Sequence, residues 1–104
     1  MGELICSNET LSKKIIYGGL TKAIYLQNKD YDDILDVGYY FMHNGCTNYP
    51  QSGSTNNWHF LRVTVWIKNL SKYVLQEAFP FQGTPSMWVR VRVDAKFSDW
   101  KKVY

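Results

Sequence analysis

The feature that most constrains the fold is a strict alternation of side chains near the C-terminal end of the chain. Residues 88–93 alternate valine with tryptophan or arginine, in the order Trp88, Val89, Arg90, Val91, Arg92, Val93. A period of two is typical of a β-strand, whose successive side chains point to opposite faces of a sheet. The pattern predicts a strand with a valine face towards a core and an aromatic, cationic face towards solvent.

Residues 59–68 show the same period and predict the central strand of a sheet. One face carries Leu61, Val63, Val65 and Ile67, and the other carries Phe60, Arg62, Thr64, Trp66 and Lys68. Residues 69–72 predict a turn, and residues 73–79 predict a strand that pairs with its predecessor as an antiparallel hairpin. Pro80 ends that strand, because proline cannot donate to a central ladder. The sequence therefore predicts a mainly β fold built on a small antiparallel sheet.

The rest of the chain predicts one short helical turn, a long loop and an N-terminal arm. Residues 30–36 contain four aspartates, and one of these can cap a helical turn. Residues 43–57 are rich in Asn, Gly, Ser and Thr and predict a surface loop. Residues 1–28 hold few aromatic residues and predict an arm or stem that contacts a neighbouring subunit. Residues 29–104 are expected to form the folded domain.

Charge and composition argue against several classes of partner. The net charge is +3 and the basic residues are scattered, whereas a nucleic-acid interface needs clustered lysine and arginine. No apolar run is long enough to span a bilayer, so we expect no membrane insertion. Cys6 and Cys46 form no metal or redox spacing, and the sequence leaves open whether they form a disulfide.

Catalysis is not expected. His43 and His59 are the histidines of the chain, and no serine or cysteine lies in a nucleophile-elbow context. The aspartates of residues 30–36 lack the glycine and the terminal glutamate of a calcium-binding loop. The sequence therefore predicts no enzyme, no catalytic residue, no cofactor and no metal site.

Residues 30–104 carry a series of short motifs. Asp33–Tyr40 resembles the opening of the knob domain of R-type pyocin and phage tail fibres, and Asn48–Pro50 is similar to its Asn-x-Pro. Tyr73–Gln76 is similar to a strand of that knob, Trp88–Arg90 to its Tyr-x-Arg, and Phe97–Lys102 to its closing Trp-Ser-x-Trp. Val37 stands where that family usually has proline, and Phe97 where it has tryptophan.

The resemblance implies a receptor-binding tip of a phage tail fibre, or of a related contractile injection particle. Such a tip is expected to be a homotrimer, to reside in the virion and to be made in the cytoplasm of the host bacterium. Its expected partners are bacterial cell-surface polysaccharide or teichoic acid, and other tail or baseplate proteins. The alternative is a structural knob that serves only fibre trimerisation or docking of another tail protein.

Two groups of residues are candidates for contact with a glycan. Aromatic rings cover the C–H faces of a sugar, and polar side chains bind its hydroxyls. The first group lies on predicted outward strand positions and consists of Arg62, Trp66, Trp88, Arg90 and Arg92. The second lies in or beside the long loop and consists of Tyr49, Asn57 and Trp58. The alternative is structural, with the tryptophans in a core or subunit interface, Arg90 in an ion pair and the loop a solvated connector.

Overall fold

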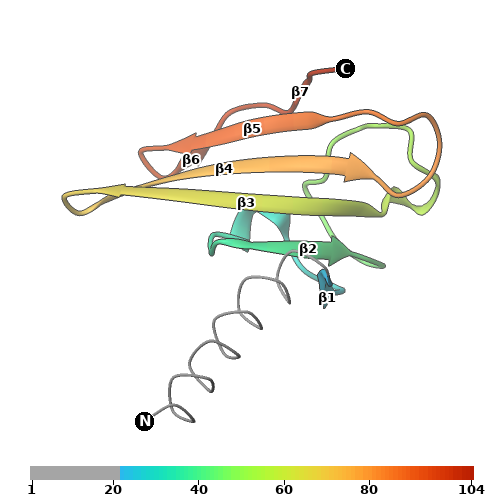
Figure 1. Ribbon diagram of the computed structural model, residues 1–104, viewed down its shortest axis with the longest axis horizontal. Coiled ribbons are helices and arrows are strands. Elements are labelled where there is room, and N and C mark those ends of the chain that lie inside the picture. The colour runs from blue at the N-terminus through green and yellow to red at the C-terminus, as the bar shows by residue number, and fades with distance from the viewer. Residues whose placement is uncertain (1–21) are drawn as a thin grey trace, which may run out of the picture.

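A computed structural model describes residues 22–104, which form a mainly β domain on one seven-stranded sheet. The strands are β1 (Ile24–Leu26), β2 (Gly38–Met42), β3 (His59–Lys68), β4 (Ser71–Pro80), β5 (Trp88–Val93), β6 (Lys96–Phe97) and β7 (Lys101–Lys102). They lie in the order β1-β2-β3-β4-β5-β6, and β7 also pairs with β5. Figure 1 shows this order from β1 at the bottom to β5 at the top. The predicted mainly β class is confirmed.

The strand pairs are antiparallel except for β1 and β2, which run parallel. Strands β3 and β4 pair along their whole length, from His59–Pro80 to Lys68–Ser71, which confirms the predicted hairpin. Residues 24–26 had been assigned to the arm, but they belong to the sheet as β1. Residues 1–21, which include Cys6 and most of the predicted arm, lie outside the described residues.

A short 3-10 turn, η1 (Tyr31–Asp33), lies between β1 and β2. The side chain of Asp30 accepts a hydrogen bond from the backbone N–H of Asp32 at 2.8 Å, which confirms the predicted aspartate cap. A second short turn, η2 (Thr55–Asn57), lies in the long loop before β3. Within residues 22–104, no helix has the length and apolar character needed to cross a membrane.

The core lies on one face of the sheet, which we call the inner face. Four of its fully or almost fully buried strand residues are Met42, Leu61, Val63 and Ala78. Segments from outside the strands cover them with Tyr31, Ile34, Cys46 and Pro50. The covering chain is therefore η1 and the loop that follows β2, and it brings residues distant in sequence onto the sheet.

The orientation of β5 is the reverse of the prediction. Arg90 pairs with Gln76 in the register of β4 and β5, and both lie on the inner face. Arg90 is only 6% exposed, whereas Val91 and Val93 are 39% and 44% exposed on the opposite, outer face. The alternation correctly predicted which residues share a face. It could not predict which face is buried, because a buried arginine needs partners that other segments supply.

Candidate binding groove

Arg90 is the centre of a buried polar network on the inner face. Its Nη2 lies 2.8 Å from Oδ1 of Asp32, and its Nε donates to Oε1 of Gln76 at 2.8 Å. Its guanidinium carbon lies 3.8 Å from the ring centroid of Phe97 and 4.5 Å from that of Trp100. Burial lowers the pKa of Arg90, and the hydrogen bond to Asp32 opposes that effect. The two rings and the carboxylate thus replace the water that a surface arginine would have.

The network continues from Arg90 through Gln76 to η1. The Gln76 side chain is fully buried, and its Nε2 donates to the carbonyl oxygens of Tyr31 at 2.7 Å and Ile34 at 2.9 Å. A neutral amide can donate twice to one segment and accept from Arg90 with its oxygen. Gln76 therefore attaches η1 to the middle of the sheet.

Asn48 attaches the long loop and the C-terminal segment to the same place. The indole Nε1 of Trp100 donates to the Asn48 carbonyl at 2.9 Å. The Asn48 side-chain amide donates to Asp30 at 2.8 Å and to Asp32 at 3.3 Å. Asn48 takes a left-handed backbone conformation, with φ 60°, which asparagine tolerates better than most residues. Gln76, Asn48 and Trp100, which belong to the motifs that resemble tail-fibre knobs, thus make hydrogen bonds that hold this fold together.

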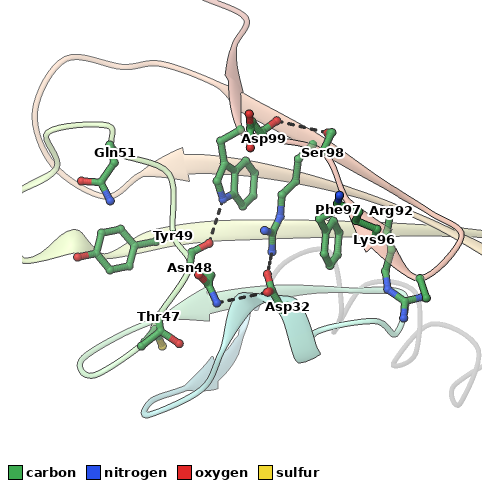
Figure 2. Close-up of a pocket in the computed structure, with 14 residues that line it drawn as sticks. Asp32, Thr47, Asn48, Tyr49, Gln51, Arg92, Lys96, Phe97, Ser98 and Asp99 are labelled. Carbon is green, nitrogen blue, oxygen red and sulfur yellow. Dashed lines mark hydrogen bonds and ion pairs between the residues drawn. The ribbon is translucent and has the colours of Figure 1, made fainter.

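A groove of about 740 Å³ lies over this network. The loop that holds Asn48, strand β5, the β5–β6 turn and the segment 97–100 contribute its walls. Figure 2 shows Tyr49 and Gln51 on one side of the groove, Arg92 on the other, and Asp32 between them. Its volume is within the usual range for sites that hold small molecules.

The groove combines ring surface with polar groups that the fold does not use. Asp32 is committed to Arg90, but the ion pairs found within residues 22–104 do not include Arg92, Lys96 or Asp99. Trp100 lines the groove as well as holding the loop. Cations, a carboxylate and an aromatic edge in one open groove can bind a ligand with several hydroxyl or acidic groups.

The structure divides the eight predicted glycan-contact residues between the two faces of the sheet. Tyr49, Arg90 and Arg92 line the groove on the inner face. The remaining residues, which do not line it, are Arg62, Trp66, Trp88, Asn57 and Trp58. The eight therefore do not form one site.

The prediction that Trp88, Arg90 and Arg92 point outward from β5 is wrong, since all three lie on the inner face, and two of them are covered. Trp88 is half-buried, packs against the core cluster and donates its Nε1 to Oγ of Ser86 at 3.1 Å. Arg90 is almost fully enclosed. Both match the structural alternative, because the inner face of β5 is the covered face of the sheet.

The two outward candidates on β3, Arg62 and Trp66, keep their predicted orientation. Arg62 forms a two-point pair with Glu77, at 2.8 Å and 3.0 Å, and the hydrogen bond to Glu77 raises the pKa of Arg62. Trp66 is 60% exposed and stacks on Tyr73 with 5.1 Å between ring centroids. Both lie on the outer face, opposite the groove.

Asn57 and Trp58 lie just before β3. Asn57 is exposed, with its backbone in the left-handed region at φ 60°. Trp58 is half-buried, donates to Oδ1 of Asn44 at 2.8 Å and lies 4.1 Å from His43, measured between ring centroids. The Trp58 ring also contacts aromatic residues of the outer face, and so belongs with that surface.

Most residues that line the groove were not predicted as contacts, among them Gln51, Lys96, Ser98 and Asp99. These four lie in loops and at a strand end, where no periodicity marks a side chain as inward or outward. Their signal was position relative to two motifs, since Gln51 and Lys96 adjoin Asn48–Pro50 and Phe97–Lys102, and Ser98 and Asp99 lie within the second. The Trp100–Asn48 hydrogen bond is what brings these two segments together.

His59 lies inside the fold and does not line the groove. It is fully buried, its Nε2 lies 2.7 Å from Oγ of Ser52, and burial lowers its pKa to about 4. Residues 22–104 contain no group of three or more His, Cys, Asp or Glu side chains placed to hold a metal ion. Cys46 is a buried free cysteine.

The geometry defines a class: a β-sheet domain with an open, polar and aromatic groove on its covered face. Comparison of the chain with protein-family models, with curated proteins and with solved structures finds no match. The similarity to tail-fibre knobs therefore rests on the motifs in the sequence, and the function that it implies is a proposal.

Proposed function

We propose that this chain is a non-catalytic, glycan-binding tip of a phage tail fibre, and that the groove is its binding site. The ligand class is a bacterial cell-surface polysaccharide or teichoic acid. The proposed active form is a homotrimer in the virion. The observation that carries the proposal is the groove, which places Tyr49, Gln51, Arg92 and Asp99 around one space.

The chemistry of a polymer coat suits this groove. Sugar hydroxyls need donors and acceptors in fixed positions, which Gln51 and Asp99 can supply. Arg92 can form paired hydrogen bonds with a phosphate or carboxylate of an acidic polymer. An open groove accepts a segment of a long chain, whereas a closed pocket would accept only its end. Binding at each site can be weak, because linked sites in an oligomer raise the effective concentration.

The test is binding of the full chain to an array of bacterial surface polysaccharides and teichoic acids. We expect Arg92→Ala and Gln51→Ala each to weaken binding about tenfold, as expected for loss of a hydrogen bond to a charged or polar ligand. The matched control is Leu70→Ala, at a fully exposed position in the β3–β4 turn that does not line the groove. This control should bind like the unmodified chain.

Two results would contradict the proposal. One is a chain that binds none of the polymers while remaining folded. The other is unchanged binding in both groove variants together with loss in a further variant, Trp66→Ala, which would place the contact on the outer face. Circular dichroism of each variant shows whether the fold is retained.

A second candidate function is a structural knob for fibre trimerisation or for docking of another tail protein. One specific observation favours it: the outer face carries aromatic side chains that are about half exposed, namely Tyr25, Trp66 and Phe81. The two functions are compatible, since they use opposite faces of the sheet.

A further inference from the structure

The outer face of the sheet carries apolar or aromatic side chains on every strand from β1 to β5. At the end near β1 it carries an aromatic cluster, with neighbouring ring centroids 5.1–6.3 Å apart, made of Tyr25, Tyr39, Phe41, Trp58, Phe60 and Phe81. Tyr25 and Phe81 remain 54% and 44% exposed. Trp58 and Phe81, which lie just outside the strands, pack against Phe41 and Phe60 of the sheet.

The apolar surface continues across the remaining strands. Register places Leu75 of β4 beside Val91 of β5, and both point away from the core. Val91 and Val93 are 39% and 44% exposed. Trp66, stacked on Tyr73, extends this surface along the β3–β4 hairpin. Exposed apolar patches rimmed by polar residues mark interaction sites in soluble proteins, and this face has both features.

The charges at the centre of this face are already neutralised. Arg62 and Glu77 are opposite one another on β3 and β4 and form a two-point pair. The Arg62 guanidinium also lies 5.6 Å from the ring centroid of Phe79. An apolar partner can therefore cover the centre without leaving an unpaired charge, which would be costly. A strongly charged partner would gain little there.

The size of the face suits a protein partner of the same kind. Strand β3 has ten residues, which at about 3.3 Å per residue span about 33 Å, and four neighbouring strands span about 19 Å. The projected area is about 600 Å², and side-chain relief increases it towards the roughly 800 Å² per partner of a specific interface. Two apolar sheet faces pack about 10 Å apart with their side chains interdigitated.

We propose that the outer face packs against the outer faces of further copies of this chain around a threefold axis. A second copy offers a sheet of equal size and matching chemistry. Its own Arg62 is likewise paired with Glu77, so it brings no unpaired charge to the centre of the contact. The grooves lie on the opposite faces, so they remain open and point away from the contact. The inference rests on the oligomeric part of the proposed function and not on its glycan.

The test measures the mass of the full chain in solution by sedimentation and light scattering. Thr64→Arg and Val91→Arg each place a charge on the outer face, at a side chain that is exposed in the single protomer. We expect each to raise the dissociation constant of the oligomer at least about 100-fold. The matched control is Leu70→Arg, at a fully exposed position in the β3–β4 turn, which should leave the mass unchanged.

Different failures have different meanings. A folded chain that stays monomeric at the highest soluble concentration overturns the inference and the oligomeric part of the proposed function, while glycan binding by the groove still stands. An oligomer that persists in both arginine variants overturns the inference alone, since other residues then hold the copies together. If Val91→Arg fails to fold, the result with Thr64→Arg decides, because a threonine that is exposed has no core contact to lose.

Discussion

Single residues decide how the covering segments attach to the sheet. Arg90 joins Asp32 of η1 to Gln76 of β4 and lies between the rings of Phe97 and Trp100. Strands β4 and β6 already pair with β5 through the backbone, but η1 does not, so the ion pair between Arg90 and Asp32 attaches η1 to this part of the sheet. Arg92, two residues along the same strand, borders the groove and forms no such pair. The two arginines therefore have different roles despite identical side chains.

We predict that Arg90→Ala lowers the free energy of unfolding by about 3 kcal/mol, because it leaves Gln76 and Asp32 without their buried partner. The value is towards the low end for a broken buried pair, since the Asp32 side chain is 45% exposed and can be hydrated. Urea unfolding measures the change. The control is Arg92→Ala, for which we expect a change within about 0.5 kcal/mol. Equal losses in the two variants would contradict the structural role of Arg90.

Among the elements, the β5–β6 hairpin has an unusual turn. Its two loop residues, Asp94 and Ala95, have φ of 53° and 63°, between the paired residues Val93 and Lys96. Two positive φ angles are the pattern of a type I′ turn, which suits the twist of a hairpin and favours glycine at the second position. Alanine there places its Cβ against the backbone. This turn lies at the edge of the groove, since Ala95 and Lys96 line it.

We predict that Ala95→Gly raises the free energy of unfolding by about 0.5–1 kcal/mol. Glycine removes the energetic penalty of a left-handed backbone in the folded turn, and its greater flexibility in the unfolded chain offsets only part of that gain. Thermal unfolding measures the gain. The matched control is Ala78→Gly, at a buried position within β4. That variant should lose about 1.5 kcal/mol, since glycine in a strand interior adds entropy to the unfolded state and removes a buried methyl group. A loss in both variants would show that the turn is not strained.

On the scale of the whole molecule, burial of a neutral histidine makes folding depend on pH. His59 is fully enclosed, and its Nδ1 lies 3.2 Å from the Asn57 carbonyl and 3.2 Å from the Tyr31 hydroxyl. A proton on Nδ1 can be donated to Asn57, which leaves Nε2 to accept from the Ser52 hydroxyl. Burial lowers the pKa of His59 from 6.5 to about 4, so the folded state holds it neutral.

The sign of the pH effect follows from linkage. Between pH 6.5 and 4 the unfolded chain binds a proton at His59 that the folded chain does not bind, so stability falls as the pH falls through this range. The loss from this residue is about 3 kcal/mol. We predict that His59→Gln flattens the pH dependence of urea unfolding in that window, whereas His43→Gln retains it. An unaltered slope in His59→Gln would contradict the prediction.

The sequence alone determined the strand pattern of this protein, because side-chain periodicity is a local property. Residues 59–68 and 88–93 predicted two strands from a period of two, and the aspartates of residues 30–36 predicted a capped helical turn, which the structure shows as η1 with Asp30 as its cap. Only the tertiary structure decided which face of β5 is buried. The answer depended on Asp32 and Gln76, which reach Arg90 from segments far away in the chain. The same reason applies to the groove, which Gln51 and Asp99 both line. Their segments are brought together by the hydrogen bond from Trp100 to the Asn48 carbonyl, and no local pattern in the sequence encodes that contact.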